Sequence, residues 1–144
     1  MRPLALHLYA ECFLNAACSL PSPNVPFEPV RPYLVCHAIE LGLKAFLSLQ
    51  GFTMLNLSEN IYGHDLNKIL QKADENKIKA YIALTDDHCV YIRLASNYYS
   101  GKVFEYPTVF EAMQCYPDMP PIDELFSAAT ILVESLRQSC LEAK

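Results

Sequence analysis

The residues best suited to chemistry lie in the most apolar stretch of the chain, HAIELGLKAFLSL at positions 37–49. His37, Glu40, Lys44 and Ser48 follow one another at intervals of three, four and four residues. On an α-helix this spacing places the four side chains along one narrow line, because each residue advances the helix by about 100°. The sequence therefore predicts a polar stripe, formed by these four residues, on an otherwise apolar helix.

The polar stripe has two interpretations. If it is exposed, the Glu40–Lys44 pair stands in water, where such a pair stabilises a helix by about 0.3 kcal/mol. If it faces a cleft or a subunit interface, the pair has to stay together, because a buried charge without a partner costs about 3–5 kcal/mol. Gly42 favours close approach of another helix, since a glycine within a helix costs about 1 kcal/mol relative to alanine.

A second group of candidate residues lies in IRLASNYYSGK, which ends at Lys102. Arg93, Asn97 and Ser100 are four and three residues apart and share one helix face, and Lys102 follows just beyond it. These side chains are suited to holding a phosphate by charge-assisted hydrogen bonds. In the alternative interpretation Arg93 pairs with a carboxylate on a neighbouring helix, Asn97 is solvated and the tyrosines beside it pack.

Two further histidines stand at predicted helix starts. We expect His64 to satisfy a backbone group or to pack against Tyr62 rather than to act as a base, and we group it with the stripe residues as part of the same cleft or interface. His88 falls in the first turn of a helix, where positive charge is disfavoured, so we expect a neutral and solvated imidazole. His37 and His88 each adjoin a cysteine, but sequence neighbours point to different helix faces. The sequence therefore predicts no metal site and no cofactor.

Composition indicates one acidic domain of 144 residues, with 16 acidic and 11 basic side chains and a formal charge of -5. No run of lysine or arginine offers a surface for duplex DNA. The six cysteines form no C-x-x-C pair, which argues against a zinc ribbon. We expect buried, free thiols in a reducing, cytoplasmic compartment.

The elements that must position these residues are helices. Periodic apolar residues predict helices at 4–20, 30–50 and 122–142, with two more that begin at Asp65 and Thr85. Residues 77–84 fit either a helical turn or a short extended piece. The proline-rich segment 21–32 is expected to connect the first two helices, with Pro29 or Pro32 tolerated in the first turn of the second. The fold class is an all-α bundle of four or five helices.

The N-terminal helix is not expected to be a signal peptide or a membrane span. His7, Glu11 and Asn15 interrupt its apolar run at intervals of four, which is the pattern of an amphipathic helix with one polar stripe. No stretch of the chain is expected to reach the ~18 apolar residues that a membrane span requires. We therefore expect a cytoplasmic protein without a membrane partner.

The segments AIELGLKAFL and GHDLNKILQKA, separated by a loop, resemble the HEPN superfamily of small helical domains. The resemblance covers about residues 34–75, and the flanking helices agree in order and length. It implies a bundle of four or five helices, often dimeric. It also implies roles in RNA cleavage, in toxin–antitoxin pairs beside a nucleotidyltransferase or antitoxin, or in partner binding within defence systems.

Active ribonucleases of that superfamily carry an arginine followed, after four to six residues, by a histidine. Two copies meet across a dimer and act on the phosphate and the ribose 2′-hydroxyl. Here Arg93 is followed at the possible histidine positions by Tyr98, Tyr99 and Ser100. A neutral tyrosine, with an ordinary pKa near 10, is a poor general base at pH 7. The resemblance therefore implies a catalytically degenerate member, in which only Arg93, Asn97 and Tyr98 are weak candidates for catalysis.

Aromatic residues concentrate in one third of the chain, from Tyr91 to Tyr116. Tyrosine buries apolar area while keeping a hydroxyl at the edge, which suits interfaces. We expect a homodimer seam here, with a lid over the bundle core as the alternative. The group comprises Tyr91, Tyr98, Tyr99, Phe104, Tyr106, Phe110 and Tyr116.

Three functions follow from the sequence. The first is a non-catalytic subunit that associates with a nucleotide, RNA or a protein partner. The second is an active, metal-independent ribonuclease or nucleotide-handling enzyme with an atypical site around Arg93. The third is an assembly domain without a ligand.

Overall fold

The computed structural model describes residues 2–23, 28–53, 55–57, 62–101, 104–105 and 118–143. Within these ranges the chain is all-helical, as predicted, and no strand is present. The helices are α1 (Pro3–Ser19), α2 (Val30–Leu49), α3 (Leu66–Glu75), α4 (Ile78–Tyr81), α5 (Asp86–Tyr99) and α7 (Ile122–Glu142).

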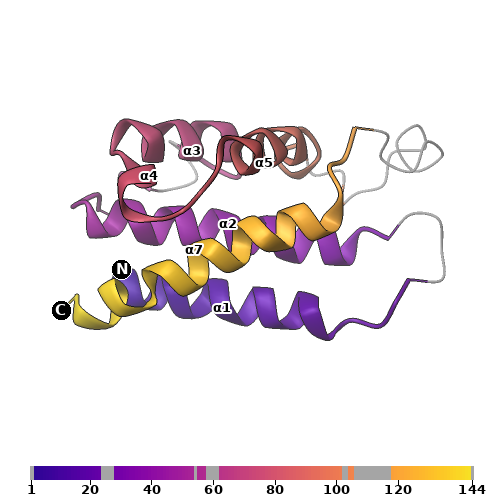
Figure 1. Ribbon diagram of the computed structural model, residues 1–144, viewed down its shortest axis with the longest axis horizontal. Coiled ribbons are helices and arrows are strands. Elements are labelled where there is room, and N and C mark those ends of the chain that lie inside the picture. Colours follow the sequence, from indigo (N-terminus) through magenta and orange to yellow (C-terminus); the bar gives the residue numbers. More distant parts are fainter. Residues whose placement is uncertain are drawn as a thin grey trace.

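Helix α2 is the central element of the fold. It packs against α1 and α7 and, on another side, against α3 and α5. Figure 1 shows the long helices α1, α2 and α7 running along the molecule, with α3, α4 and α5 gathered over one side of α2. The run from Ala38 to Leu47 is buried without interruption. Such burial all round explains why the sequence of this helix is apolar on almost every face.

The predicted starts of α3 and α5 are confirmed by their caps. The Asp65 carboxylate accepts hydrogen bonds from the backbone N–H groups of Asn67 and Lys68 at 3.0 and 3.2 Å. The Thr85 hydroxyl accepts from the backbone of His88 at 3.1 Å, and the His88 ring accepts from the backbone of Thr85 at 3.2 Å. These bonds satisfy donors that a helix N-terminus leaves without intrahelical partners.

The start of α2 tolerates its prolines as expected. Pro29 occupies the cap position and Pro32 lies in the first turn, where no helical hydrogen bond is lost. The Glu28 carboxylate accepts hydrogen bonds from the backbone of Val30 and Arg31 at 2.7 and 3.1 Å. The connector therefore ends at Pro29 rather than at Pro32.

The ambiguous segment 77–84 contains the one-turn helix α4. Lys77 adopts a left-handed conformation with φ of 61°, which reverses the chain between α3 and α4. Ile78, Ile82 and Leu84 are buried in the core. The segment is thus a helical turn followed by a short extended piece, and its apolar residues anchor the link to α5.

Two histidines are more buried than the sequence analysis expected. His7 is fully buried on α1, and its Nε2 lies 2.6 Å from the carbonyl oxygen of Val133 on α7. His88 is buried as well, with Nε2 3.1 Å from the hydroxyl of Ser127. The solvated interpretation is wrong for His88, and His7 does not lie on an exposed polar stripe, because a partner on α7 covers each ring. Nδ1 of His88 accepts a backbone hydrogen bond, which fits the expected neutral ring.

The five cysteines in the described residues are free, as expected. Cys36, Cys89 and Cys140 are buried, but Cys12 and Cys18 are exposed on α1. The prediction of burial was wrong for those two, because α1 packs only through its other face. Cys115 lies outside the described residues.

Helix α2 is also long and apolar enough, by length and composition, to cross a membrane, contrary to expectation. Of its most apolar window, 61% is buried inside the bundle. The core helix of a globular domain has the same composition as a membrane span, because both are surrounded by apolar groups. This property of α2 therefore does not distinguish between the two environments.

Candidate functional site

The polar stripe of α2 is the centre of a buried polar cluster. The Glu40 and Lys44 residues are only 2% and 8% exposed, so the interpretation of the stripe as solvent-exposed is wrong for this pair. Their charged groups stay together, with Lys44 Nζ 3.3 Å from Glu40 Oε2. We call the set of His37, Glu40, Lys44, His64 and Tyr99 the α2 polar cluster.

Glu40 accepts hydrogen bonds on both carboxylate oxygens. Oε1 lies 2.6 Å from Nδ1 of His64 and 3.0 Å from the hydroxyl of Tyr99. Oε2 receives the Lys44 ammonium, which also lies 3.4 Å from the carbonyl oxygen of Gly63. Three parts of the chain, namely α2, the turn before α3 and the end of α5, thus converge on one carboxylate. This number of donors explains how a negative charge is buried here.

His64, which the sequence grouped with the stripe, contacts Glu40. The GHD segment forms the turn that precedes α3, and the Asp65 cap fixes that turn. The imidazole therefore projects toward α2 with Nδ1 against the carboxylate, at 2.6 Å. The contact joins residues 24 positions apart, so helical spacing alone does not predict its geometry.

His37 shares the Tyr99 hydroxyl with Glu40. Its Nδ1 lies 2.7 Å from that hydroxyl. Because Tyr99 donates its one proton to Glu40, Nδ1 of His37 is the donor to the Tyr99 oxygen. The ring meets Phe13 edge-on at 4.4 Å and stacks on Tyr33 at 5.9 Å between centroids.

Burial shifts the titration of two members of the cluster. It lowers the pKa of His37 below its ordinary value, although the nearby Glu40 charge acts in the opposite direction. Burial also raises the pKa of Tyr99 far above its ordinary value, and the adjacent Glu40 carboxylate adds to that effect. Tyr99 is therefore a neutral phenol at physiological pH.

Ser48, the last residue of the predicted stripe, is separate from the cluster. It lies one turn beyond Lys44, is partly buried, and no hydrogen bond joins it to the described members of the cluster. Three members of the cluster, His37, Glu40 and Lys44, thus lie on one face of α2 as predicted, and His64 and Tyr99 join them from the turn before α3 and the end of α5.

The second candidate site lies on α5, at the surface. The Arg93 guanidinium is half-exposed and pairs through Nη2 with Asp74 of α3 at 3.6 Å. Asn97 is exposed, whereas Tyr98 and Tyr99 are buried. The alternative interpretation of this segment, with a carboxylate partner for Arg93, a solvated Asn97 and packed tyrosines, is therefore confirmed.

The remaining residues predicted to hold a phosphate do not join Arg93. The Ser100 hydroxyl is hydrogen-bonded to the carbonyl oxygen of Ser96, one turn earlier in its own helix. Lys102 lies outside the described residues. Within the part of the chain that the structure describes, only Arg93 and Asn97 of the predicted set line a common surface.

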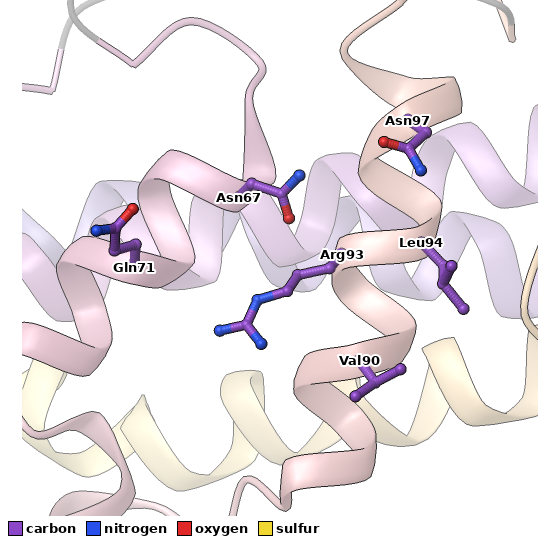
Figure 2. A pocket seen from close by; sticks show the side chains of 6 residues that line it. All are labelled: Asn67, Gln71, Val90, Arg93, Leu94 and Asn97. Atoms are coloured by element: carbon purple, nitrogen blue, oxygen red, sulfur yellow. The ribbon is translucent and has the colours of Figure 1, made fainter.

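That surface is a groove between α3 and α5, with a volume of about 470 Å³. Figure 2 shows Asn67 of α3 and Arg93 of α5 extending toward each other across it. The Asn67 side-chain oxygen is buried and has no hydrogen-bond partner among the described residues. The groove thus combines one cation with several amides and a small apolar surface. Its lining residues are Asn67, Gln71, Val90, Arg93, Leu94 and Asn97.

Of the four described aromatic residues that were expected at a dimer seam, three pack inside the chain, and Tyr91 is partly buried. Tyr98, Tyr99 and Phe104 are buried in the core, and the rings of Tyr98 and Phe104 stack at 6.1 Å. The backbone N–H of Asp118 donates to the Tyr98 hydroxyl at 3.0 Å. These residues therefore form the alternative, a lid over the bundle. Tyr106, Phe110 and Tyr116 lie outside the described residues.

No protein-family model, curated protein or solved structure matches this chain.

Proposed function

We propose that this chain is a non-catalytic, HEPN-like binding domain that holds a nucleotide unit, free or as part of RNA, in the groove between α3 and α5. The observation that carries the proposal is the composition of that groove. Arg93 supplies a cation at the position of the arginine in the superfamily motif, and amides surround it. Guanidinium and amide groups are the side chains that bind phosphate oxygens and base edges.

The surroundings of Arg93 support binding rather than cleavage. Metal-independent cleavage of RNA needs a base beside the ribose 2′-hydroxyl. The positions where the motif would place a histidine hold two buried tyrosines and Ser100. His37 and His64 are directed toward Glu40 and Tyr99 instead. An acidic chain with one groove arginine also suits a short ligand better than a long polyanion.

The proposal extends to assembly and cellular role. We expect a homodimer in the cytoplasm that acts beside a nucleotidyltransferase or antitoxin partner, in a toxin–antitoxin or defence-type system. The nucleotidyltransferase or antitoxin partner and the type of system rest on the motif resemblance. Size-exclusion chromatography with light scattering tests the homodimer, and a chain that remains monomeric at high concentration would contradict it.

Binding of a fluorescent single-stranded oligoribonucleotide and of ATP tests the groove. Arg93→Ala is expected to weaken binding by roughly tenfold or more, since hydrogen bonds to charged groups contribute about 1.5–3 kcal/mol. Arg137→Ala is the matched control. Arg93 and Arg137 have side chains that are 50% and 48% exposed, and each pairs with one carboxylate, Asp74 and Glu11 respectively.

Three results decide the outcome. Loss of binding in Arg93→Ala with binding retained in Arg137→Ala supports the proposal. Absence of binding by the unmodified chain contradicts it. RNA cleavage that disappears in Arg93→Ala would instead establish the alternative, an active ribonuclease.

A further inference from the structure

The α2 polar cluster contains three metal-ligating groups that the proposed function does not use. Nδ1 of His37, a carboxylate oxygen of Glu40 and Nδ1 of His64 all lie within 4.8 Å of one another. Two imidazoles and one carboxylate form a ligand set that zinc adopts in proteins. We propose that these three side chains bind a divalent transition metal ion of the zinc class.

The distances in the cluster are close to those of such a site. Donor atoms of a tetrahedral zinc site stand about 3.3 Å apart, given metal–ligand bonds of about 2.0–2.2 Å. Nδ1 of His64 is 2.6 Å from Glu40 Oε1, Nδ1 of His37 is 3.9 Å from the other carboxylate oxygen, Oε2, and the ligand atoms of the three residues lie within 4.8 Å of one another. The donor atoms are thus close to the spacing that a tetrahedral site requires, without yet having it. Small rotations about the side-chain bonds therefore bring the three donor atoms around one ion.

The Tyr99 hydroxyl stands at the fourth corner of this arrangement. It is 2.7 Å from Nδ1 of His37, 3.5 Å from Nδ1 of His64 and 3.0 Å from the carboxylate of Glu40. It therefore borders all three donor atoms. As a neutral phenol it serves as a hydrogen-bond donor to the Glu40 ligand, which is the role that outer groups commonly have around metal sites.

The ligands are held by rigid parts of the fold. His37 and Glu40 are one turn apart on α2, the most buried helix. His64 lies in a turn that the Asp65 cap fixes, and Phe13 and Tyr33 pack on the ring of His37. A site on supported side chains loses little conformational entropy when an ion binds. The side chains of His37 and His64 are 18% and 27% exposed, which gives the ion access from solvent.

Lys44 is the group that opposes a cation here. Its ammonium contacts Oε2 of Glu40, whereas His64 and Tyr99 contact Oε1. The ion would therefore approach Oε1, and Lys44 can remain on Oε2 and on the Gly63 carbonyl. Removing the lysine charge should consequently tighten binding of the ion.

The chemistry of the ligands identifies the class of ion. Nitrogen and carboxylate donors without a thiolate suit Zn²⁺, Co²⁺ and Ni²⁺ better than Cu⁺, and the two imidazoles argue against Mg²⁺ and Ca²⁺. A bound ion would link α2 to the turn that begins α3. The inference is independent of the nucleotide groove, which lies on other side chains.

The test uses the full-length chain without an affinity tag, in a Cys12→Ser/Cys18→Ser background that removes the exposed thiols. Metal-free protein is titrated with Zn²⁺ by calorimetry and with Co²⁺ by visible absorption. We expect one ion per chain and the absorption bands of a four-coordinate cobalt site. His64→Gln and His37→Gln should each weaken binding by roughly tenfold or more, the size of effect that even outer-shell changes produce. His88→Gln, which alters a histidine of the α5 cap, should leave the affinity unchanged.

A measurement on the unsubstituted histidines guards against variants that fail to fold. In ¹⁵N-resolved spectra, Zn²⁺ should shift the imidazole signals of His37 and His64 and leave those of His7 and His88 in place. Lys44→Met should bind Zn²⁺ more tightly. The proposal is overturned if no ion binds stoichiometrically, if the signals of His37 and His64 do not move, or if Lys44→Met binds no more tightly than the unmodified chain.

Discussion

Glu40 is a buried carboxylate at which three segments of the chain meet. It accepts hydrogen bonds from Lys44, His64 and Tyr99, which belong to three different segments. A buried carboxylate stays charged and stable only while its hydrogen-bond donors are present. Without them, nothing compensates the free energy that is lost when the charge is removed from water. The same carboxylate therefore fixes the packing of α2 against the start of α3 and the end of α5.

Glu40→Gln should destabilise the fold by about 3–5 kcal/mol, because it leaves the buried Lys44 ammonium without its charged partner. Urea denaturation followed by circular dichroism measures the change. Glu75→Gln is the matched control. It breaks an exposed pair with Lys72 of similar length, 3.1 Å, and should lower stability far less than Glu40→Gln, because water screens exposed charges.

The double variant Glu40→Gln/Lys44→Met separates the charge effect from lost packing. It removes both charges, so it should recover at least about half of the loss, or about 2 kcal/mol. A loss of stability in Glu40→Gln no larger than that in the exposed control would show that the Glu40–Lys44 pair is solvated rather than buried.

At the scale of elements, α2 and α7 approach each other closely at Gly42. A Cβ atom at this glycine would lie 3.3 Å from the Cβ atom of Leu132. The absence of a side chain thus lets two long helices meet, as the mid-helix glycine suggested in the sequence. Glycine lowers the stability of the helix relative to alanine. Close packing against the fully buried Leu132 offsets that cost.

Gly42→Val should destabilise the fold by about 1–3 kcal/mol, because the added methyl groups overpack the contact with Leu132. Urea denaturation provides the measurement. In combination with Leu132→Ala, which opens space at the same point, the loss should be at least about 1 kcal/mol smaller than the sum of the two single losses. Simple additivity of the two losses would contradict close packing of these positions.

At the scale of the whole molecule, the five described cysteines differ in whether the bundle buries them. Cys36, Cys89 and Cys140 lie in the core, whereas Cys12 and Cys18 lie on the outer face of α1. Burial raises the pKa of Cys140 to about 11, and it raises the pKa values of Cys36 and Cys89 as well. Reactivity of a thiol requires the thiolate and access to it. Labelling of these residues therefore reports the integrity of the whole bundle.

Cys12 and Cys18 should react with a water-soluble maleimide at pH 7.5 at least roughly tenfold faster than the three core thiols, since these are protonated and shielded. Peptide mapping by mass spectrometry gives the rate for each cysteine. Denaturant should abolish the difference. Equal rates in the native protein would indicate that the core is open, and failure of the thiols to react under denaturing conditions would indicate that they are not free.

The order of the helices could be predicted from local sequence because the signals are local. The last helix spans Ile122–Glu142, as predicted from its apolar period, and Asp65 and Thr85 cap the helices they were predicted to start. Burial of polar side chains was harder to predict. The spacing of four residues predicted that His7, Glu11 and Asn15 share a polar face of α1. Glu11 and Asn15 are partly or fully exposed, as that prediction requires, whereas α7 covers His7. Which face of an amphipathic helix meets a neighbour depends on that neighbour.

The sequence by itself determined the helical class, the helix boundaries and the presence of Glu40 and Lys44 on one line of α2, because propensity, capping and periodicity act over a few residues. Only the tertiary structure decided that this line is buried, that His64 and Tyr99 complete it, and that Arg93 faces Asp74 across a groove. Those contacts join residues 19 to 62 positions apart. They exist because the packing of α3 and α5 on α2 brings the segments together, and no local pattern encodes that packing.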